Sequence, residues 1–112
     1  MSEGGRSMAW LFLCVAGVLE IAFAFGVKWS QGFARLMPTM FTFVTGVASV
    51  YLLSRALRTL PTGTGYAVWT GIGAVGTVAL GIVLFGESAA LSRLSCLGLI
   101  VTGILGLKVL GE

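Results

Sequence analysis

Residues 8–27 read MAWLFLCVAGVLEIAFAFGV, an apolar run interrupted by one charged residue, Glu20. At 1.5 Å rise per residue, a helix of this length crosses the hydrocarbon core of a bilayer, so the run predicts a transmembrane helix. A carboxylate in hydrocarbon costs about 2.5–3.5 kcal/mol on insertion scales, and such residues usually serve a function. The plainer alternative is a helix-end glutamate that reaches back to water, but the apolar run continues to Val27. We therefore take Glu20 as the centre of a functional site.

The composition of the whole chain supports a membrane protein. Of its 112 residues, 57% are hydrophobic and 10% are charged, whereas soluble domains carry roughly 25% charged residues. Lys108 interrupts the last apolar segment close to its end, where a lysine side chain can extend to the interface. We predict an all-α membrane protein with one four-helix transmembrane domain over residues 8–110, preceded by a disordered N-terminus at residues 1–7. The four short transmembrane helices are expected near residues 8–28, 36–56, 64–85 and 93–110.

The first segment also resembles a secretory signal peptide. Arg6, the apolar run and the sequence Ala22-Phe23-Ala24 match the charged region, the hydrophobic region and the small-residue cleavage site of such a peptide. Glu20 and Phe25 would flank the cut unfavourably, and the apolar run continues beyond it. A retained membrane helix is the better interpretation.

Several kinds of chemistry are disfavoured by the residue content. The chain has no histidine, so a histidine proton relay and Ser-His catalysis are excluded. Its two cysteines, Cys14 and Cys96, lie inside apolar segments and are interpreted as small packing residues. We expect no metal, no cofactor and no enzyme activity. The net charge of +3 is spread over the connecting segments without runs, which argues against a nucleic-acid surface.

The positive charges do not select one orientation in the membrane. The two ends of the predicted bundle carry four and three basic residues, a bias too small for the positive-inside rule to act on. A chain that inserts in both orientations can form an antiparallel pair. In addition, four short helices are too few to enclose a transport pathway by themselves. We therefore expect a dual-topology antiparallel dimer. The basic residues at one end are Arg6, Arg55, Arg58 and Lys108, and those at the other are Lys28, Arg35 and Arg93.

Small residues recur in the third and fourth segments. Glycine in a membrane helix allows close approach of a neighbouring backbone, and a glycine cluster can also mark a bend. Close packing and a working hinge are both open for the third segment, with Gly71, Gly73 and Gly76 as hinge candidates. Spacing four apart in the fourth segment suits a dimer seam, with packing inside the protomer as the alternative. The seam residues would be Gly98, Thr102 and Gly106.

Polar side chains of the second and third segments fall on single helix faces. Thr42, Thr45 and Ser49 share one stripe, and Tyr66 and Trp69 lie close together on the next helix. Membrane helices turn polar groups toward partners or a watery cavity, so these stripes are expected to face the acid. For each hydroxyl alone, a bond to the carbonyl four residues earlier is the plainer interpretation.

A buried carboxylate has two natural ligands, a proton and a cation. Protonation removes the charge that would hold a cation, and a bound cation favours the ionised form, so the two compete for the same group. If alternating access carries one species out and the other in, that competition is sufficient for antiport. A pair of Glu20 residues, one per subunit, would titrate as a unit.

The chain resembles the small multidrug resistance family from residue 8 to residue 108. Within this family, the segments at 69–76 and 86–89 are similar to the guanidinium-exporter branch. Where this chain has Trp69-Thr70-Gly71, the multidrug branch usually has Trp-Ser-Gly. The segments that carry the resemblance are GVK at 26–28, GFARL at 32–36, PTGTGYAVW at 61–69, WTGIGAVG at 69–76 and GESA at 86–89.

The resemblance implies roles for individual residues. Glu20 matches the position that binds both proton and cation. Ser49, Tyr66 and Trp69 match positions of a hydrogen-bond network around that acid, and Gly17 stands where a small residue is expected. The family assembles as an antiparallel dual-topology dimer.

This sequence departs from the guanidinium branch at two positions near the site. Phe23 stands where that branch has tryptophan three residues after the acid, so an indole N–H donor is missing. Gly65 replaces the commoner alanine before the tyrosine. Both changes could loosen the pocket toward larger hydrophobic ammonium ions, or mark one half of a heterodimeric pair.

We therefore expect a proton-coupled antiporter that exports small guanidinium-type cations across the cell (inner) membrane. Its partners would be the organic cation, protons, the lipid bilayer and a second subunit. Two alternatives stay open at this point. One is a broader quaternary-ammonium or multidrug exporter, and the other is a subunit that works only beside a paralogous partner as a heterodimer.

Overall fold

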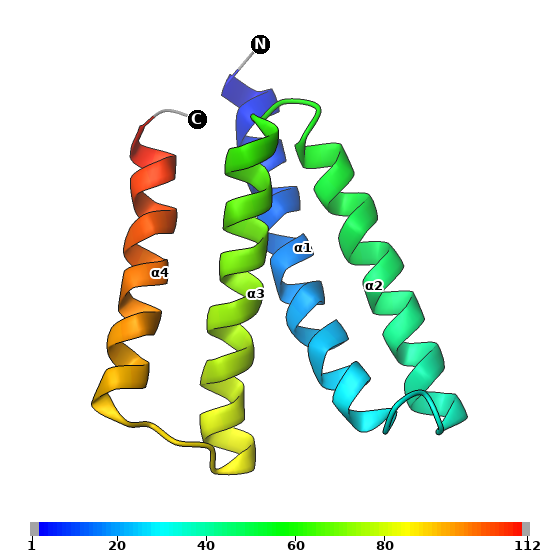
Figure 1. Ribbon diagram of the computed structural model, residues 1–112. Coiled ribbons are helices and arrows are strands. Elements are labelled where there is room, and N and C mark those ends of the chain that lie inside the picture. Colours follow the sequence, from blue (N-terminus) through cyan, green and yellow to red (C-terminus); the bar gives the residue numbers. More distant parts are fainter. Residues whose placement is uncertain (1–2, 111–112) are drawn as a thin grey trace.

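The computed structural model describes residues 3–110, and within this range it is built from four long helices (Figure 1). Each helix is long and apolar enough to cross a membrane. The prediction of an all-α, multi-pass membrane protein is confirmed. The helices are α1 (Glu3–Trp29), α2 (Leu36–Ala56), α3 (Thr62–Phe85) and α4 (Leu91–Val109).

The N-terminal segment differs from the expectation. Residues 3–7 continue α1 as helix, whereas residues 1–7 were expected to be disordered. Extending an existing helix adds one hydrogen bond for each residue fixed, so a helix that starts inside the membrane continues readily into a short polar segment. Residues 1 and 2 lie outside the described part of the chain.

The connection between α1 and α2 is a tight turn with left-handed backbone. The Ser30 hydroxyl donates to the Val27 carbonyl (2.8 Å) and accepts from the Phe33 N–H (3.1 Å), so it stabilises the end of α1. Gln31, Gly32 and Phe33 all have positive φ. A bulky residue with positive φ is uncommon. The bulky residue with positive φ in this turn is Phe33, which lines the cavity described below.

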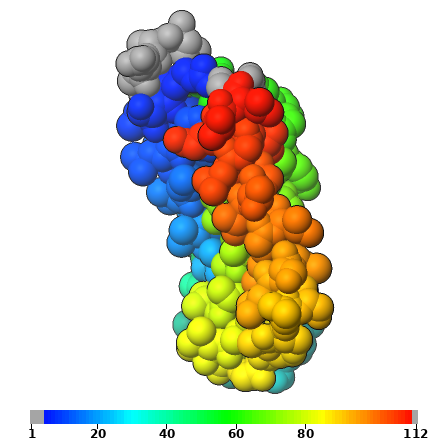
Figure 2. Space-filling model, turned by 90° about the vertical axis from the view of Figure 1, so that its left-hand side faces the viewer, coloured from blue at the N-terminus to red at the C-terminus, as the bar shows by residue number. Residues whose placement is uncertain are grey.

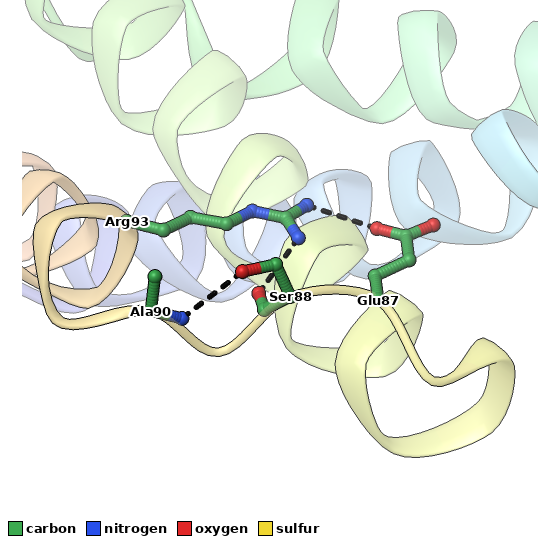
Figure 3. Close-up of polar contacts among 4 residues, drawn as sticks. All are labelled: Glu87, Ser88, Ala90 and Arg93. Atoms are coloured by element: carbon green, nitrogen blue, oxygen red, sulfur yellow. Dashed lines mark hydrogen bonds and ion pairs between the residues drawn. The ribbon is translucent and has the colours of Figure 1, made fainter.

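The connection between α3 and α4 is held by a glycine and an ion pair. Gly86 has φ 65°, and its N–H and that of Glu87 both donate to the Gly81 carbonyl, which ends α3. Arg93 then donates to the Glu87 carboxylate (2.9 Å) and to the Ser88 carbonyl (2.8 Å), as Figure 3 shows. Short connections of this kind make consecutive helices run antiparallel.

The four helices form a thin layer rather than a closed bundle. Helix α1 contacts both α2 and α3 along much of its length, α2 and α3 contact each other little, and α4 packs along α3. Figure 1 shows α2 and α3 spreading apart with distance from their shared connection. The backbone measures 44 × 35 × 18 Å, and Figure 2 shows its narrow side, with α4 in front. A layer this thin leaves both broad faces open.

The buried apolar core lies toward one end of this layer. It joins the first half of α1 to the end of α2 and the start of α3, where the three helices are closest. Its members are Ala9, Leu13, Ala16, Leu53, Ala56, Leu60 and Val68. Because this end is packed, the opposite halves of α2 and α3 are free to diverge.

Glycines set the close approach of α3 to its neighbours. A methyl group added at Gly17 of α1 would meet Cγ2 of Ile72 at 2.6 Å, and one added at Gly76 would meet Ile21. Gly71 accommodates Ile104 of α4 in the same way. These contacts support the packing interpretation of Gly71 and Gly76, and α3 is continuous through them. A hinge at Gly71, Gly73 and Gly76 stays a prediction.

Helix α4 leaves its small-residue stripe uncovered within the protomer. Its partly buried side chains, such as Ile100 and Ile104, face α3, whereas added methyl groups at Gly98 and Gly106 would meet nothing within 4 Å. Thr102 between them is exposed and donates to the Gly98 carbonyl (2.7 Å). Intramolecular packing, one of the two sequence interpretations, therefore does not account for this stripe among the described residues.

We predict that Gly17→Ala destabilises the protein, because the new methyl group would collide with the branched Ile72 side chain. Overpacking of this kind costs about 1–3 kcal/mol, which lowers the melting temperature of the purified protein in detergent. Gly63→Ala is the matched control, since a methyl group there would meet nothing within 4 Å. Equal melting temperatures for the two variants would contradict the tight α1–α3 contact.

Candidate functional site

A large cavity lies where α2 diverges from α3, with α1 forming its base. Its volume is about 800 Å³, which is within the roughly 300–1,000 Å³ typical of small-molecule sites. One wall is formed by α2 side chains that are themselves more than half exposed, so the cavity is open on that side. The lining residues are Glu20, Phe23, Phe33, Thr42, Phe43, Gly46, Val47, Val50, Tyr51, Ser54 and Trp69.

Glu20 supplies the charge of this cavity. Its Cγ lies 2.6 Å from where a Cβ on Gly73 would stand, so the missing side chain on α3 makes the room for it. Within residues 5–110, the Glu20 carboxylate has no hydrogen-bond or ion-pair partner. It is also the only charged side chain in the cavity lining among these residues. A free carboxylate in a cavity lined by aromatic rings is suited to binding a cation.

The hydroxyl groups of the α2 stripe were expected to face Glu20, but they donate to backbone carbonyls. Thr42, Thr45 and Ser49 are all buried, but Thr42 donates to the Pro38 carbonyl (2.8 Å) and Thr45 to the Phe41 carbonyl (2.9 Å). These are bonds to the carbonyl four residues earlier, the plainer of the two interpretations. Thr42 lines the cavity as well, while Thr45 lies outside the cavity lining.

Ser49 connects three helices one turn away from the acid. The Trp69 indole N–H donates to the Ser49 hydroxyl (2.9 Å), which in turn donates to the Ala16 carbonyl of α1 (2.7 Å). This chain fixes the Trp69 ring in the cavity wall beside Glu20. The expected network of Ser49 and Trp69 around the acid is therefore present as a bond between those two residues, without a direct bond to the carboxylate.

The remaining predicted site residues are Phe23, Tyr66 and Gly17, and only Phe23 lines the cavity. Phe23 lines the cavity and packs on Gly46 of α2. Tyr66 is 56% exposed and lies outside the cavity lining, with its ring 5.5 Å from that of Trp69. Gly17 faces Ile72 rather than the cavity. The structure thus brings together Glu20, Phe23 and Trp69, and it leaves Tyr66 at the surface of the protomer.

The cavity contains a second stripe of α2 that the sequence interpretation missed. These residues recur three or four positions apart on the helix face next to the hydroxyl stripe, a spacing visible in the sequence. They are apolar except for Tyr51 and Ser54, so their residue types could not be distinguished from those of a lipid-facing stripe. The missed lining residues are Phe43, Gly46, Val47, Val50, Tyr51 and Ser54 of α2, together with Phe33 from the turn before it.

Metal chemistry finds no support in the side chains that the structure describes. No group of three or more potential metal ligands occurs among them. Cys14 and Cys96 are both free and exposed, so they do not pack between the helices as the sequence suggested.

Comparisons with known proteins agree with the family resemblance. The family model described as Small Multidrug Resistance protein matches residues 8–100. A protein of Yersinia pseudotuberculosis serotype I (strain IP32953), named Guanidinium exporter, is 60% identical over 102 residues, 91% of this chain and 98% of that protein. Proteins of the same name from Citrobacter freundii and Salmonella typhimurium are 55% identical over 91% of this chain and 97% of their own length.

We predict that Ser49→Ala releases Trp69 from its fixed position. The substitution leaves the partly buried indole N–H without its acceptor, which costs at most about 1–3 kcal/mol. In a background of Trp10→Phe and Trp29→Phe, Trp69 fluorescence should shift and lose anisotropy. Thr45→Val is the control, since Thr45 bonds carbonyls of its own helix. If Ser49→Ala and Thr45→Val give the same spectrum, the bond between Ser49 and Trp69 does not position the ring.

Proposed function

Because the chain belongs to the small multidrug resistance family, we propose that it is a proton-coupled antiporter exporting guanidinium-type cations. It would act in the cell (inner) membrane, with protons and substrate competing for Glu20. The observation that carries the proposal is the unpartnered Glu20 carboxylate in an aromatic cavity that lacks positive side chains among residues 5–110.

The shape of a guanidinium ion suits a carboxylate. The ion is planar and presents N–H donors in a fixed fork, and the two carboxylate oxygens accept two of them in parallel. The aromatic side chains beside Glu20 add attraction between their ring faces and the cation, worth about 0.5–2 kcal/mol for each well-placed ring. Phe23 on α1 and Trp69 on α3 are two of the aromatic residues that line the cavity with Glu20.

Exchange follows from the shared binding group. A protonated Glu20 has lost the charge that holds the cation, and a bound cation keeps Glu20 ionised, so each ligand displaces the other. If the occupied and protonated forms alone change the side to which the cavity opens, export of one cation is tied to uptake of protons. Bending of α3 near Gly71, Gly73 and Gly76 is our candidate for that change, because this part of α3 carries Trp69 and faces Glu20.

A second subunit would complete the site. The exposed α2 wall leaves the cavity open, and the uncovered stripe of α4 at Gly98, Thr102 and Gly106 offers a close-packing surface. We propose an antiparallel homodimer that places two Glu20 carboxylates in one cavity. The near-equal basic charge of the two ends allows both orientations. A heterodimer with a paralogous chain is the alternative assembly.

One observation favours a broader substrate range as the second candidate function. The cavity of about 800 Å³ is much larger than a guanidinium ion and is mostly apolar in its lining. Phe23 also offers a ring without an N–H donor. Quaternary ammonium ions would fit such a cavity. They have no N–H groups, so they need an apolar surface and a negative charge but no hydrogen-bond acceptors.

The proposal predicts that Glu20→Gln abolishes exchange. In liposomes containing purified protein, guanidinium uptake driven by a pH gradient should fall to the level of protein-free liposomes. Proton release on adding guanidinium in detergent should disappear too, because the amide neither ionises nor holds a cation. Glu87→Gln is the matched control, since Glu87 pairs with Arg93 in the α3–α4 connection.

The same assay separates the two candidate functions. Wild-type protein that carries tetraalkylammonium ions and no guanidinium would exclude guanidinium export and favour the broader exporter. Coupled exchange that persists in Glu20→Gln would exclude the shared-group mechanism for both.

The proposed dimer predicts that bulk on the α4 stripe separates the subunits. Gly98→Leu with Gly106→Leu should lower the dimer fraction severalfold, measured by single-molecule photobleaching in liposomes, and should lower transport with it. Gly103→Leu is the control, because Gly103 is also uncovered but lies about 100° around α4 from Thr102, the middle of the stripe. A double variant that stays dimeric would remove α4 from the interface.

A further inference from the structure

A second cavity lies at the end of the molecule where α1 meets α2. Its volume is about 490 Å³, and it is separate in its lining from the cavity that contains Glu20. The C-terminal turns of α1 and α3 and the first turns of α2 form it, at the lower end in Figure 1. Since α1 and α3 both end there, this cavity lies at the level where the membrane meets water.

Aromatic pairs form two of its walls. The rings of Phe25 and Phe85 are 5.5 Å apart between α1 and α3, and those of Trp29 and Phe41 are 6.0 Å apart between α1 and α2. All four line the cavity. A half-exposed tryptophan such as Trp29 suits the interface between headgroups and acyl chains. The walls are therefore suited to hydrocarbon at this depth.

The charges of the lining are all positive. Lys28 and Arg35 line the cavity, and the Lys28 ammonium is held 4.3 Å from the centre of the Phe85 ring. No carboxylate lines the cavity among the described side chains, and neither cation has an ion-pair partner there. Glu87, an acid in the α3–α4 connection at this end, is bonded to Arg93 (Figure 3).

Arg35 has an additional reason to need an anion. It stands directly before α2, at the end of the helix that carries a partial positive charge, and the first turn of α2 contains no acidic residue. Its position is therefore unfavourable by itself, in contrast to Lys28, which complements the C-terminal end of α1. An anion between Lys28 and Arg35 would neutralise both.

From this combination we infer a binding site for an anionic phospholipid, with its phosphate between Lys28 and Arg35 and its upper acyl chain against the aromatic walls. Basic pockets between transmembrane helices bind anionic headgroups in this way. A soluble phosphate would use the two cations but gain nothing from four aromatic rings, so the lipid is the occupant that uses the whole cavity. The site is independent of the transport function proposed above.

The inference is tested by native mass spectrometry of the detergent-solubilised full chain titrated with phosphatidylglycerol or with phosphatidylcholine of the same acyl chains. Wild-type protein should bind phosphatidylglycerol at least about tenfold more tightly. Lys28→Gln with Arg35→Gln should lose that preference, since each cation near anionic lipid contributes on the order of a fivefold change in affinity. Lys28→Arg with Arg35→Lys should keep it.

Two controls make the result specific to this cavity. Arg58→Gln with Lys108→Gln removes the same charge at the opposite end and should leave the preference unchanged. Glycerol 3-phosphate, which has the headgroup chemistry without acyl chains, should displace the lipid only at far higher concentration. Equal binding of the two lipids by wild type, equal loss in the opposite-end variant, or displacement by glycerol 3-phosphate at the lipid's own concentration would each overturn the lipid site.

Discussion

An ionised carboxylate without a partner is unstable inside a membrane, and this constraint on Glu20 organises the rest of the molecule. Glu20 stands within a helix that is otherwise apolar over the bilayer, and no described side chain neutralises it. The desolvation cost can be met by a proton or by a cation from outside the protein. This requirement is the physical basis of the proton–cation exchange that we propose for Glu20.

The thin fold keeps that group reachable. The core packs the helices together only where α1 begins and α2 ends, so α2 and α3 diverge beside Glu20 and leave a cavity of about 800 Å³. At the packed side of the cavity, the bonds from Trp69 to Ser49 and from Ser49 to Ala16 hold one aromatic wall in place. The site therefore combines a fixed wall on α3 with an open wall on α2.

Unmatched positive charge at the membrane surface is the second constraint. Lys28 and Arg35 lie among aromatic rings at the end of α1, while Arg93 at the same end is paired with Glu87. Arg93 is thus neutralised within the chain, whereas Lys28 and Arg35 have no carboxylate partner among the described residues. The acid in the middle of the membrane and the two bases at its edge are thus unpaired in the part of the chain that the structure describes, which is the basis of the cation site and the lipid site that we propose.

The sequence by itself determined the helices and the acid. Length and apolarity define each span, because every backbone group in lipid must bond within its own helix, and Glu20 is conspicuous in residues 8–27 for the same reason. Only the tertiary structure decided which faces meet. It turned Ser49 toward α1, left Tyr66 at the surface and brought Phe33 and the apolar stripe of α2 to the cavity. In lipid no hydrophobic drive distinguishes one apolar helix face from another, so helix rotation depends on detailed packing, such as Ile72 against Gly17, that residue spacing does not reveal.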